Sequence, residues 1–166
     1  MAIAFPIKNY HLESGSALDR ARLVKFMQRA YRDLGAISSG AHLADTVQRH
    51  FSSHSQLWWL ISNQPATVPV GLPGTNRPEP VGCLWQGEAV DQRTGVKQAY
   101  VFLLYVAPDH RHQGLGMAMM KHAQQWAKQQ GYSQIGLQVF EDNVSALNLY
   151  QKLGYRTQAR WLSLEI

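Results

Sequence analysis

The most chemically distinctive residues lie in the segment 109–116. It contains Arg111, Gly114 and Gly116, and it follows a β-rich run that stops at Pro108 and precedes a run with helical spacing. A glycine-bearing turn at the start of a helix directs several backbone N–H groups, and the positive end of the helix dipole, at one point. Glycine also allows close approach to the backbone, because it has no Cβ. The spacing therefore predicts a binding site for a phosphate or pyrophosphate group.

Two common phosphate-binding motifs do not match this turn. A P-loop requires lysine and then serine or threonine after its second glycine, and no such pair follows here. The dinucleotide-binding fingerprint requires a third glycine three residues after the second, where Met119 stands. Neither motif fits.

A second segment with defined spacing lies downstream. Residues 134–140 are typical of a strand, and Asn143 can cap a helix over 144–153 that Gly154 ends. Together the two segments resemble motifs A and B of the GNAT acetyltransferase superfamily. Motif A is matched by the R-x-x-G-x-G at 111–116, and motif B, N-x-x-A-x-x-L-Y-x-x-x-G-[FY], is matched at every specified position over 143–155. The resemblance covers the chain from about residue 80 onward; the first 64 residues match only in element order.

The resemblance implies an acyl-CoA-dependent N-acyltransferase. Such an enzyme would transfer acetyl from acetyl-CoA, its co-substrate, to a primary amine of a small molecule, peptide or protein by direct attack in a ternary complex. The implied fold is α/β (α+β), with a mixed, mostly antiparallel central sheet that is splayed at the acyl-CoA site and flanked by helices on both faces. The acceptor is not identified, because the N-terminal helices and the loop over 65–80 would line its cleft, and the resemblance is weakest there.

The resemblance also implies roles for individual residues. The main chain around Leu104 and Val106 should pair with the pantetheine arm, and an N–H near Leu104 or Tyr105 would form an oxyanion hole. Backbone N–H groups of residues 113–117 should hold the pyrophosphate. Tyr150 matches the tyrosine that protonates the leaving thiolate, which a phenol with a pKa of about 10 can do at neutral pH. The residues expected to bind acetyl-CoA are Leu104, Tyr105, Val106, Arg111, His112, Gln113, Gly114, Leu115, Gly116, Met117 and Asn143.

The general base is left open by the sequence. Many members of the superfamily carry a glutamate on the strand before the phosphate-binding turn, but Gln98, Tyr100 and Phe102 stand there. Glu88, on the preceding strand, is the nearest acidic candidate and is assigned to the base provisionally. A water chain, or an amine that arrives neutral, would serve instead.

Composition restricts the class of protein. The chain has 166 residues, of which 45% are hydrophobic and 16% charged, and this is typical of one globular domain over 1–166. The apolar runs are too short for a membrane-spanning helix, so we expect no membrane partner. Cys83 is the sole cysteine, which excludes an internal disulfide and fits a reducing compartment. We therefore expect a cytoplasmic protein.

Other functions are weighed against this interpretation. A net charge of +5 raises the alternative of a nucleic-acid-binding domain, but the basic residues are scattered, and no nucleic-acid partner is expected. A CoA-binding sensor module without turnover is favoured by the absent strand glutamate and disfavoured by the intact Tyr150. His50 and His54 are four residues apart without a glutamate after His50, so no metal site is expected. For the assembly of the chain, the hypothesis is a homodimer.

The remaining elements follow from hydrophobic spacing and turn residues. Helices are expected over 16–34, 41–53, 115–130 and 144–153, and strands over 3–9, 57–61, 81–90, 97–107, 134–140 and 155–164, with a surface loop over 65–80.

Overall fold

The protein folds around one twisted sheet with helices packed on both faces. The structure, a computed structural model, describes residues 2–3, 5–35, 40–64 and 78–166. Its strands are β1 (Ala2–Ile3), β2 (Tyr10–Ser14), β3 (Gln56–Ser62), β4 (Gly82–Val90), β5 (Lys97–Val106) and β6 (Ile135–Leu137). Its helices are α1 (Arg20–Asp33), α2 (Ala41–His50), α3 (Leu115–Gln129) and α4 (Val144–Lys152), with short 3-10 turns at η1 (Ala17–Asp19) and η2 (Pro108–His110).

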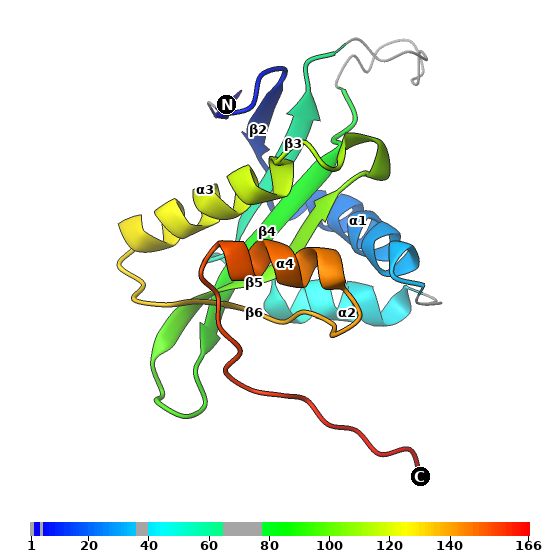
Figure 1. The fold of residues 1–166 in the computed structure, drawn as a ribbon. Helices are drawn as coiled ribbons and strands as arrows, with labels where there is room; N and C mark the ends of the chain where they lie inside the picture. Colours follow the sequence, from blue (N-terminus) through cyan, green and yellow to red (C-terminus); the bar gives the residue numbers. More distant parts are fainter. Residues whose placement is uncertain (1, 4, 36–39, 65–77) are drawn as a thin grey trace.

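The strands follow chain order across the sheet, from β1 at one edge to β6 at the other. Neighbouring strands are antiparallel from β1 to β5, and only β5 and β6 run parallel. Figure 1 shows α3 and α4 on one face of this sheet and α1 and α2 on the other. The predicted fold class, a mixed and mostly antiparallel sheet between two layers of helices, is therefore confirmed.

Two apolar cores hold the layers together, one on each face. Side chains alternate along β3, so that Trp59 and Ile61 pack with α1 and α2, whereas Trp58 and Leu60 pack with α3. Five consecutive residues of this strand are buried. A strand covered on both faces shows a continuous apolar run instead of an alternating one, and this explains the sequence LWWLI at 57–61.

Most expected elements are confirmed with small shifts at their ends. The helices expected over 16–34, 41–53, 115–130 and 144–153 correspond to α1 to α4, and the strands over 57–61, 81–90 and 97–107 correspond to β3, β4 and β5. The strand expected over 134–140 is shorter and comprises only β6. The loop expected over 65–80 lies mostly outside the described residues.

The first strand was wrongly placed at 3–9. Pro6 has no N–H to donate, and Asn9 adopts a left-handed conformation with φ of 68° that reverses the chain. The chain therefore forms a hairpin in which β1 pairs with β2 through Ile3 and Leu12.

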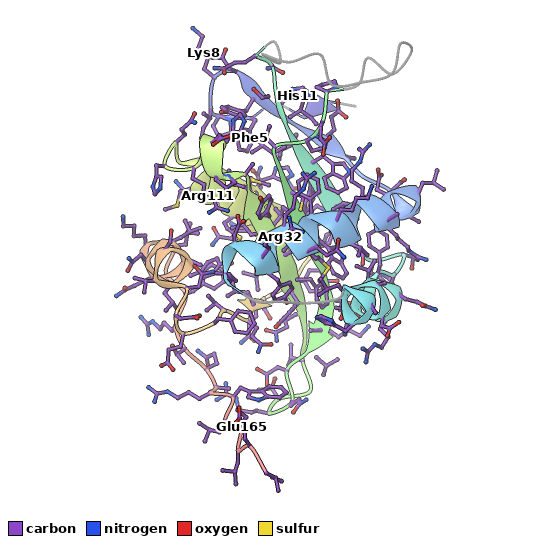
Figure 2. All side chains as sticks on the ribbon, turned by 90° about the vertical axis from the view of Figure 1, so that its right-hand side faces the viewer. Phe5, Lys8, His11, Arg32, Arg111 and Glu165 are labelled. Atoms are coloured by element: carbon purple, nitrogen blue, oxygen red, sulfur yellow. The ribbon has the colours of Figure 1, made fainter. Side chains whose placement is uncertain are left out.

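The strand expected over 155–164 is also wrong. The Tyr155 N–H donates to the Tyr150 carbonyl (2.9 Å), and the chain beyond it has no regular structure and runs away from the body (Figure 1). Trp161 and Leu164 are 83% and 86% exposed. A strand requires a neighbouring edge of matching length, and β6 is only three residues long. Figure 2 shows Glu165 at the opposite end of the molecule from Lys8 and His11.

Candidate active site

The sheet opens between its two parallel strands. β5 and β6 pair only over Ala99–Val101 and Ile135–Leu137, although β5 continues to Val106. The second half of β5 therefore lies beyond the end of β6. A cleft of about 700 Å³ occupies this opening, lined by residues 102–106, the start of α3 and α4. The splayed site implied by the resemblance is thus present as a geometric feature.

The turn at the end of β5 directs backbone groups toward this cleft. Gly114 has φ of +77°, a conformation that side chains with a Cβ rarely adopt, and it precedes the first residue of α3. The first helical bond runs from the Ala118 N–H to the Gly114 carbonyl (3.0 Å). The N–H groups of Leu115, Gly116 and Met117 come before this first bond and lie at the positive end of the helix, where N–H groups have no acceptor within the helix. All three residues line the cleft.

Gly116 lies where the start of α3 approaches α4 closely. A Cβ at this position would lie 3.3 Å from Leu149 Cδ2 and 3.9 Å from Leu104 Cδ2. A larger side chain would therefore fill the space between β5 and α4. The cradle formed by Gly114 and Gly116 fits a phosphate-bearing ligand, because its floor is main chain and it has no Cβ of its own at these two positions.

Arg111 holds the turn in place. Its Nε donates to the Val106 carbonyl (2.8 Å), and its guanidinium forms an ion pair with Asp33 at the end of α1. Its Cζ lies 5.7 Å from the centroid of the Tyr105 ring. The side chain therefore connects the end of β5 to α1 while it lines the cleft.

Gln113 is the one residue of the expected acetyl-CoA set that does not line the cleft. Its Oε1 accepts a hydrogen bond from the Tyr10 hydroxyl (3.2 Å), which also contacts His110 Nδ1 (2.8 Å). Tyr10 thus anchors the turn to β2. Sequence analysis missed this tyrosine, since nothing in the local pattern links residues 100 positions apart.

α4 contributes the two residues that motif B singles out. Asn143 caps the helix, because its Oδ1 accepts from the Ala146 N–H (3.2 Å). Tyr150 lines the cleft with its ring 5.7 Å from that of Tyr155. Burial raises the pKa of Tyr150 to about 12, with a smaller contribution from Tyr155. The phenol therefore carries its proton throughout the neutral range.

A second cavity adjoins the cleft on the side of α1 and α2. It has a volume of about 510 Å³, and we call it the aromatic pocket. It shares with the cleft the residues Tyr31, Val101, Phe102, Gln138 and Phe140. A β-bulge lies at this junction: Trp85 pairs with Leu103 and Gln86 pairs with Val101, so Phe102 is the extra residue.

Glu88 lies at the aromatic pocket and not at the cleft. Its carboxylate accepts from Lys97 Nζ (2.8 Å) and from the Tyr132 hydroxyl (3.0 Å). These bonds, with that from Lys97 the stronger, hold the pKa of Glu88 below its ordinary value. A carboxylate with a lowered pKa and two donors is a weak proton acceptor.

Neither a metal-binding cluster nor a membrane span occurs in the part of the chain that the structure describes. Within the described ranges, no three histidine, cysteine, aspartate or glutamate side chains gather closely enough to ligate a metal ion. None of the described helices combines the length and apolarity needed to cross a bilayer.

Comparison with known proteins agrees with this geometry. The model of the acetyltransferase (GNAT) family matches residues 33–155. N-acetyltransferase family 8 member 3 of Mus musculus is 32% identical over 114 residues, which cover 69% of this chain and 45% of that protein. N-acetyltransferase 8 of Homo sapiens is 30% identical over 115 residues, 69% of this chain and 44% of that protein. The chain spans about half the length of the curated relatives it matches.

Solved structures share the fold. A predicted acetyltransferase from Clostridium acetobutylicum, crystallised with acetyl-CoA, superposes with a TM-score of 0.70 at 16% identity and covers 94% of this chain and 96% of its own. An aminoglycoside acetyltransferase from an uncultured soil metagenomic sample, in complex with sisomicin, superposes with a TM-score of 0.64 at 13% identity, over 95% and 97% of the two chains.

Proposed function

The chain belongs to the GNAT acetyltransferase family, and on this premise we propose that it transfers acetyl from acetyl-CoA to a primary amine. One observation carries the proposal: β5 continues past the end of β6 and leads directly into the N-terminus of α3. The opening suits a long, narrow ligand with a phosphate at one end. The named relatives, all N-acetyltransferases, support the same reaction class.

The donor is held mainly by backbone groups in this proposal. The N–H groups at the start of α3 would bind the pyrophosphate, and the free edge of β5 around Leu104 and Val106 would pair with the amides of the pantetheine arm. Bound acetyl-CoA supplies a thioester-activated acetyl group. The N–H of Leu104 or Tyr105 would stabilise negative charge on the acetyl oxygen. Asn143 would hold the first turn of α4 beside the arm.

Tyr150 acts as the general acid. Its hydroxyl stays protonated at neutral pH because burial raises its pKa to about 12, and its place on the wall of the cleft suits proton donation to the departing sulfur. The protons balance over one turnover: the nitrogen of the neutral amine bonds to the acetyl carbon, the carbon–sulfur bond breaks, and the sulfur receives the proton of Tyr150. The proton that the nitrogen loses passes through water and restores the Tyr150 hydroxyl.

The amine must lose one proton, and the one carboxylate among the described residues that line the cleft, Asp33, is paired with Arg111. Glu88, the provisional base, is bonded to Lys97 and Tyr132 at the aromatic pocket. We propose that the amine arrives neutral and that the proton it loses as the amide forms passes to water. Glu88 then contributes only to the wall of the aromatic pocket. The kinetics of a Glu88 substitution distinguish this role from that of a general base.

Three finer expectations belong to this proposal. The single thiol of Cys83, buried within the core, supports a cytoplasmic location. The exposed apolar side chains beyond α4, such as Trp161 and Leu164, support a homodimer. The scattered positive charge supports a small anionic ligand, with no nucleic-acid partner.

Calorimetric titration tests the proposal. Acetyl-CoA, CoA, ATP and a short DNA duplex are titrated separately at two salt concentrations, and thiol release is then followed with a panel of amines. We expect saturable binding that requires the pantetheine arm, followed by turnover. Equal binding of ATP would show that the turn at Gly114 does not recognise CoA. Binding without turnover on any amine would favour a sensor module, and a steep loss of DNA binding with salt would favour nucleic-acid recognition.

A further inference from the structure

We propose that the acceptor is a monoamine with an aryl-sized apolar group, and that this group occupies the aromatic pocket beside the cleft. The inference rests on the proposed function, because the pocket matters for catalysis only if acetyl is transferred at the adjoining cleft. It adds the class of amine, which neither the motifs nor the named relatives of the chain assign.

The walls of the aromatic pocket are rings that already contact one another. Phe102 is stacked with Trp85, with centroids 4.6 Å apart and planes at 27°. The rings of Tyr100 and His50 each lie 5.0 Å from Phe102. Trp85 is fully buried, so the stack has a rigid base. An aromatic group on the ligand can extend such an array by offset or edge-to-face contact.

The junction of the two cavities explains how ring and amine would be placed. Phe102 lines both cavities and is the extra residue of the bulge, next to the free edge of β5. Tyr31 and Phe140, whose ring centroids are 6.1 Å apart, lie at the same junction. A ligand with its ring in the pocket therefore presents a short amine-bearing chain to the cleft. A volume of about 510 Å³ accommodates one ring system.

The charges at the two cavities argue against a polyamine. Among the described lining residues, the carboxylates are those of Asp33 and Glu88. Asp33 is paired with Arg111, and Glu88 is paired with Lys97. Neither is left to bind an additional ammonium group. A ligand with several positive charges would lose hydration here without gaining ion pairs, and the net charge of +5 adds long-range repulsion.

The structural neighbour crystallised with sisomicin shows that this fold can accept a polycation. The proposed preference for a monoamine therefore has to come from the side chains of the aromatic pocket and not from the fold. An aromatic wall with paired carboxylates selects an apolar monoamine on the same framework.

Steady-state kinetics with matched amines test the proposal. Thiol release is measured at saturating acetyl-CoA with 2-phenylethylamine, ethylamine, spermidine and sisomicin. We expect kcat/KM for 2-phenylethylamine to exceed that for ethylamine by roughly 30-fold or more, because only the former buries a ring. Equal values for these two amines would overturn the proposal, and so would a preference for spermidine or sisomicin.

Two substitutions on β4 locate the effect. Ala89 lines the aromatic pocket, whereas the next residue, Val90, is 54% exposed and does not line it. Ala89→Phe should reduce the ratio of kcat/KM values for 2-phenylethylamine and ethylamine by about tenfold, because the added ring fills the pocket. Val90→Phe adds the same ring on the opposite face of the strand and should leave the ratio unchanged. An unchanged ratio in Ala89→Phe would place the aryl group elsewhere.

Failure of this inference can be distinguished from failure of the proposed function. If acetyl-CoA does not bind in the calorimetric titration, both fail. If acetyl-CoA binds and acetyl is transferred only to ethylamine, spermidine or sisomicin, the aryl preference alone is wrong. If acetyl-CoA binds and no amine is acetylated, the proposed transferase function fails and the aryl preference fails with it.

Discussion

The cleft and the aromatic pocket meet at Phe102, yet they are built from different kinds of groups. In the proposed function the cleft binds its ligand largely through main chain, namely the free edge of β5 and the first N–H groups of α3, with α4 closing one side. The aromatic pocket is formed by side chains from α1, α2, β4 and β5. A site made of backbone depends on the path of the chain, whereas a site made of side chains depends on each residue that projects into it.

On the proposed function, this difference assigns the common ligand, acetyl-CoA, to the cleft and the particular acceptor to the aromatic pocket. Backbone N–H groups bind a phosphate whatever side chains surround them, provided that the glycines keep the turn open. The rings of Tyr100 and Phe102 lie outside the turn, and an exchange of either would change the shape of the aromatic pocket. The proposed function therefore combines a donor fixed by the backbone with an acceptor that depends on side chains.

The largest expected effect is on kcat and concerns Tyr150, the proton donor of the proposed reaction. Tyr150→Phe removes only the hydroxyl, so kcat should fall by about 10²- to 10⁴-fold, which is the usual contribution of a general acid. The dissociation constant of acetyl-CoA should stay the same, since the ring and its packing are retained. Thiol-release kinetics and calorimetry measure the two quantities.

Tyr155→Phe is the matched control for this substitution. Its ring lies 5.7 Å from that of Tyr150, but the residue does not line the cleft. Tyr155→Phe should therefore keep kcat within a few-fold of the original. If Tyr150→Phe also kept its kcat, Tyr150 would not be the general acid. Another group would then have to donate the proton to the sulfur.

The features of the site that could be predicted from the sequence are those determined by neighbouring residues in the chain. The order strand, turn and helix from 97 to 129 is local, and glycines at 114 and 116 identify the turn directly. Motif B is equally local, because its spacing follows one helix.

The contacts that complete the site depend on pairings between distant residues. The bond between Tyr10 and Gln113 and the ion pair between Arg111 and Asp33 connect different elements, and no periodicity indicates them. The bulge at Phe102 depends on the register of β5 against β4. The incorrect strand over 155–164 has the same origin, because an apolar segment becomes a strand only when an edge is available to it.

A glycine substitution tests whether backbone geometry governs the cleft. Gly114 and Gly95 both have positive φ, +77° and +70°, but only Gly114 lines the cleft. Valine at either position should lower the free energy of unfolding by about 1–2 kcal/mol, because side chains with a Cβ are strained there. Only Gly114→Val should also weaken acetyl-CoA binding, by about tenfold or more. The added side chain would obstruct the approach of the pyrophosphate to the backbone N–H groups at the start of α3.

Denaturant unfolding and calorimetry separate these two consequences. Gly95 lies in the hairpin between β4 and β5, far from the start of α3 (Figure 1). Gly95→Val therefore measures the cost of the strained conformation alone. Equal acetyl-CoA affinities in the two variants would mean that the pyrophosphate binds away from this turn.

The smallest expected effect concerns the acidic residue on the acceptor side. The pKa of Glu88 is lowered first by its bond with Lys97 and then by the Tyr132 hydroxyl, so the carboxylate is ionised and occupied at neutral pH. Glu88→Gln should change kcat by less than about threefold, because a removed base would cost about 10²-fold or more. Lys97→Gln breaks the same ion pair without removing a carboxylate and should behave alike. A large loss of kcat in Glu88→Gln alone would identify Glu88 as the base, and the pocket would then contribute chemistry as well as shape.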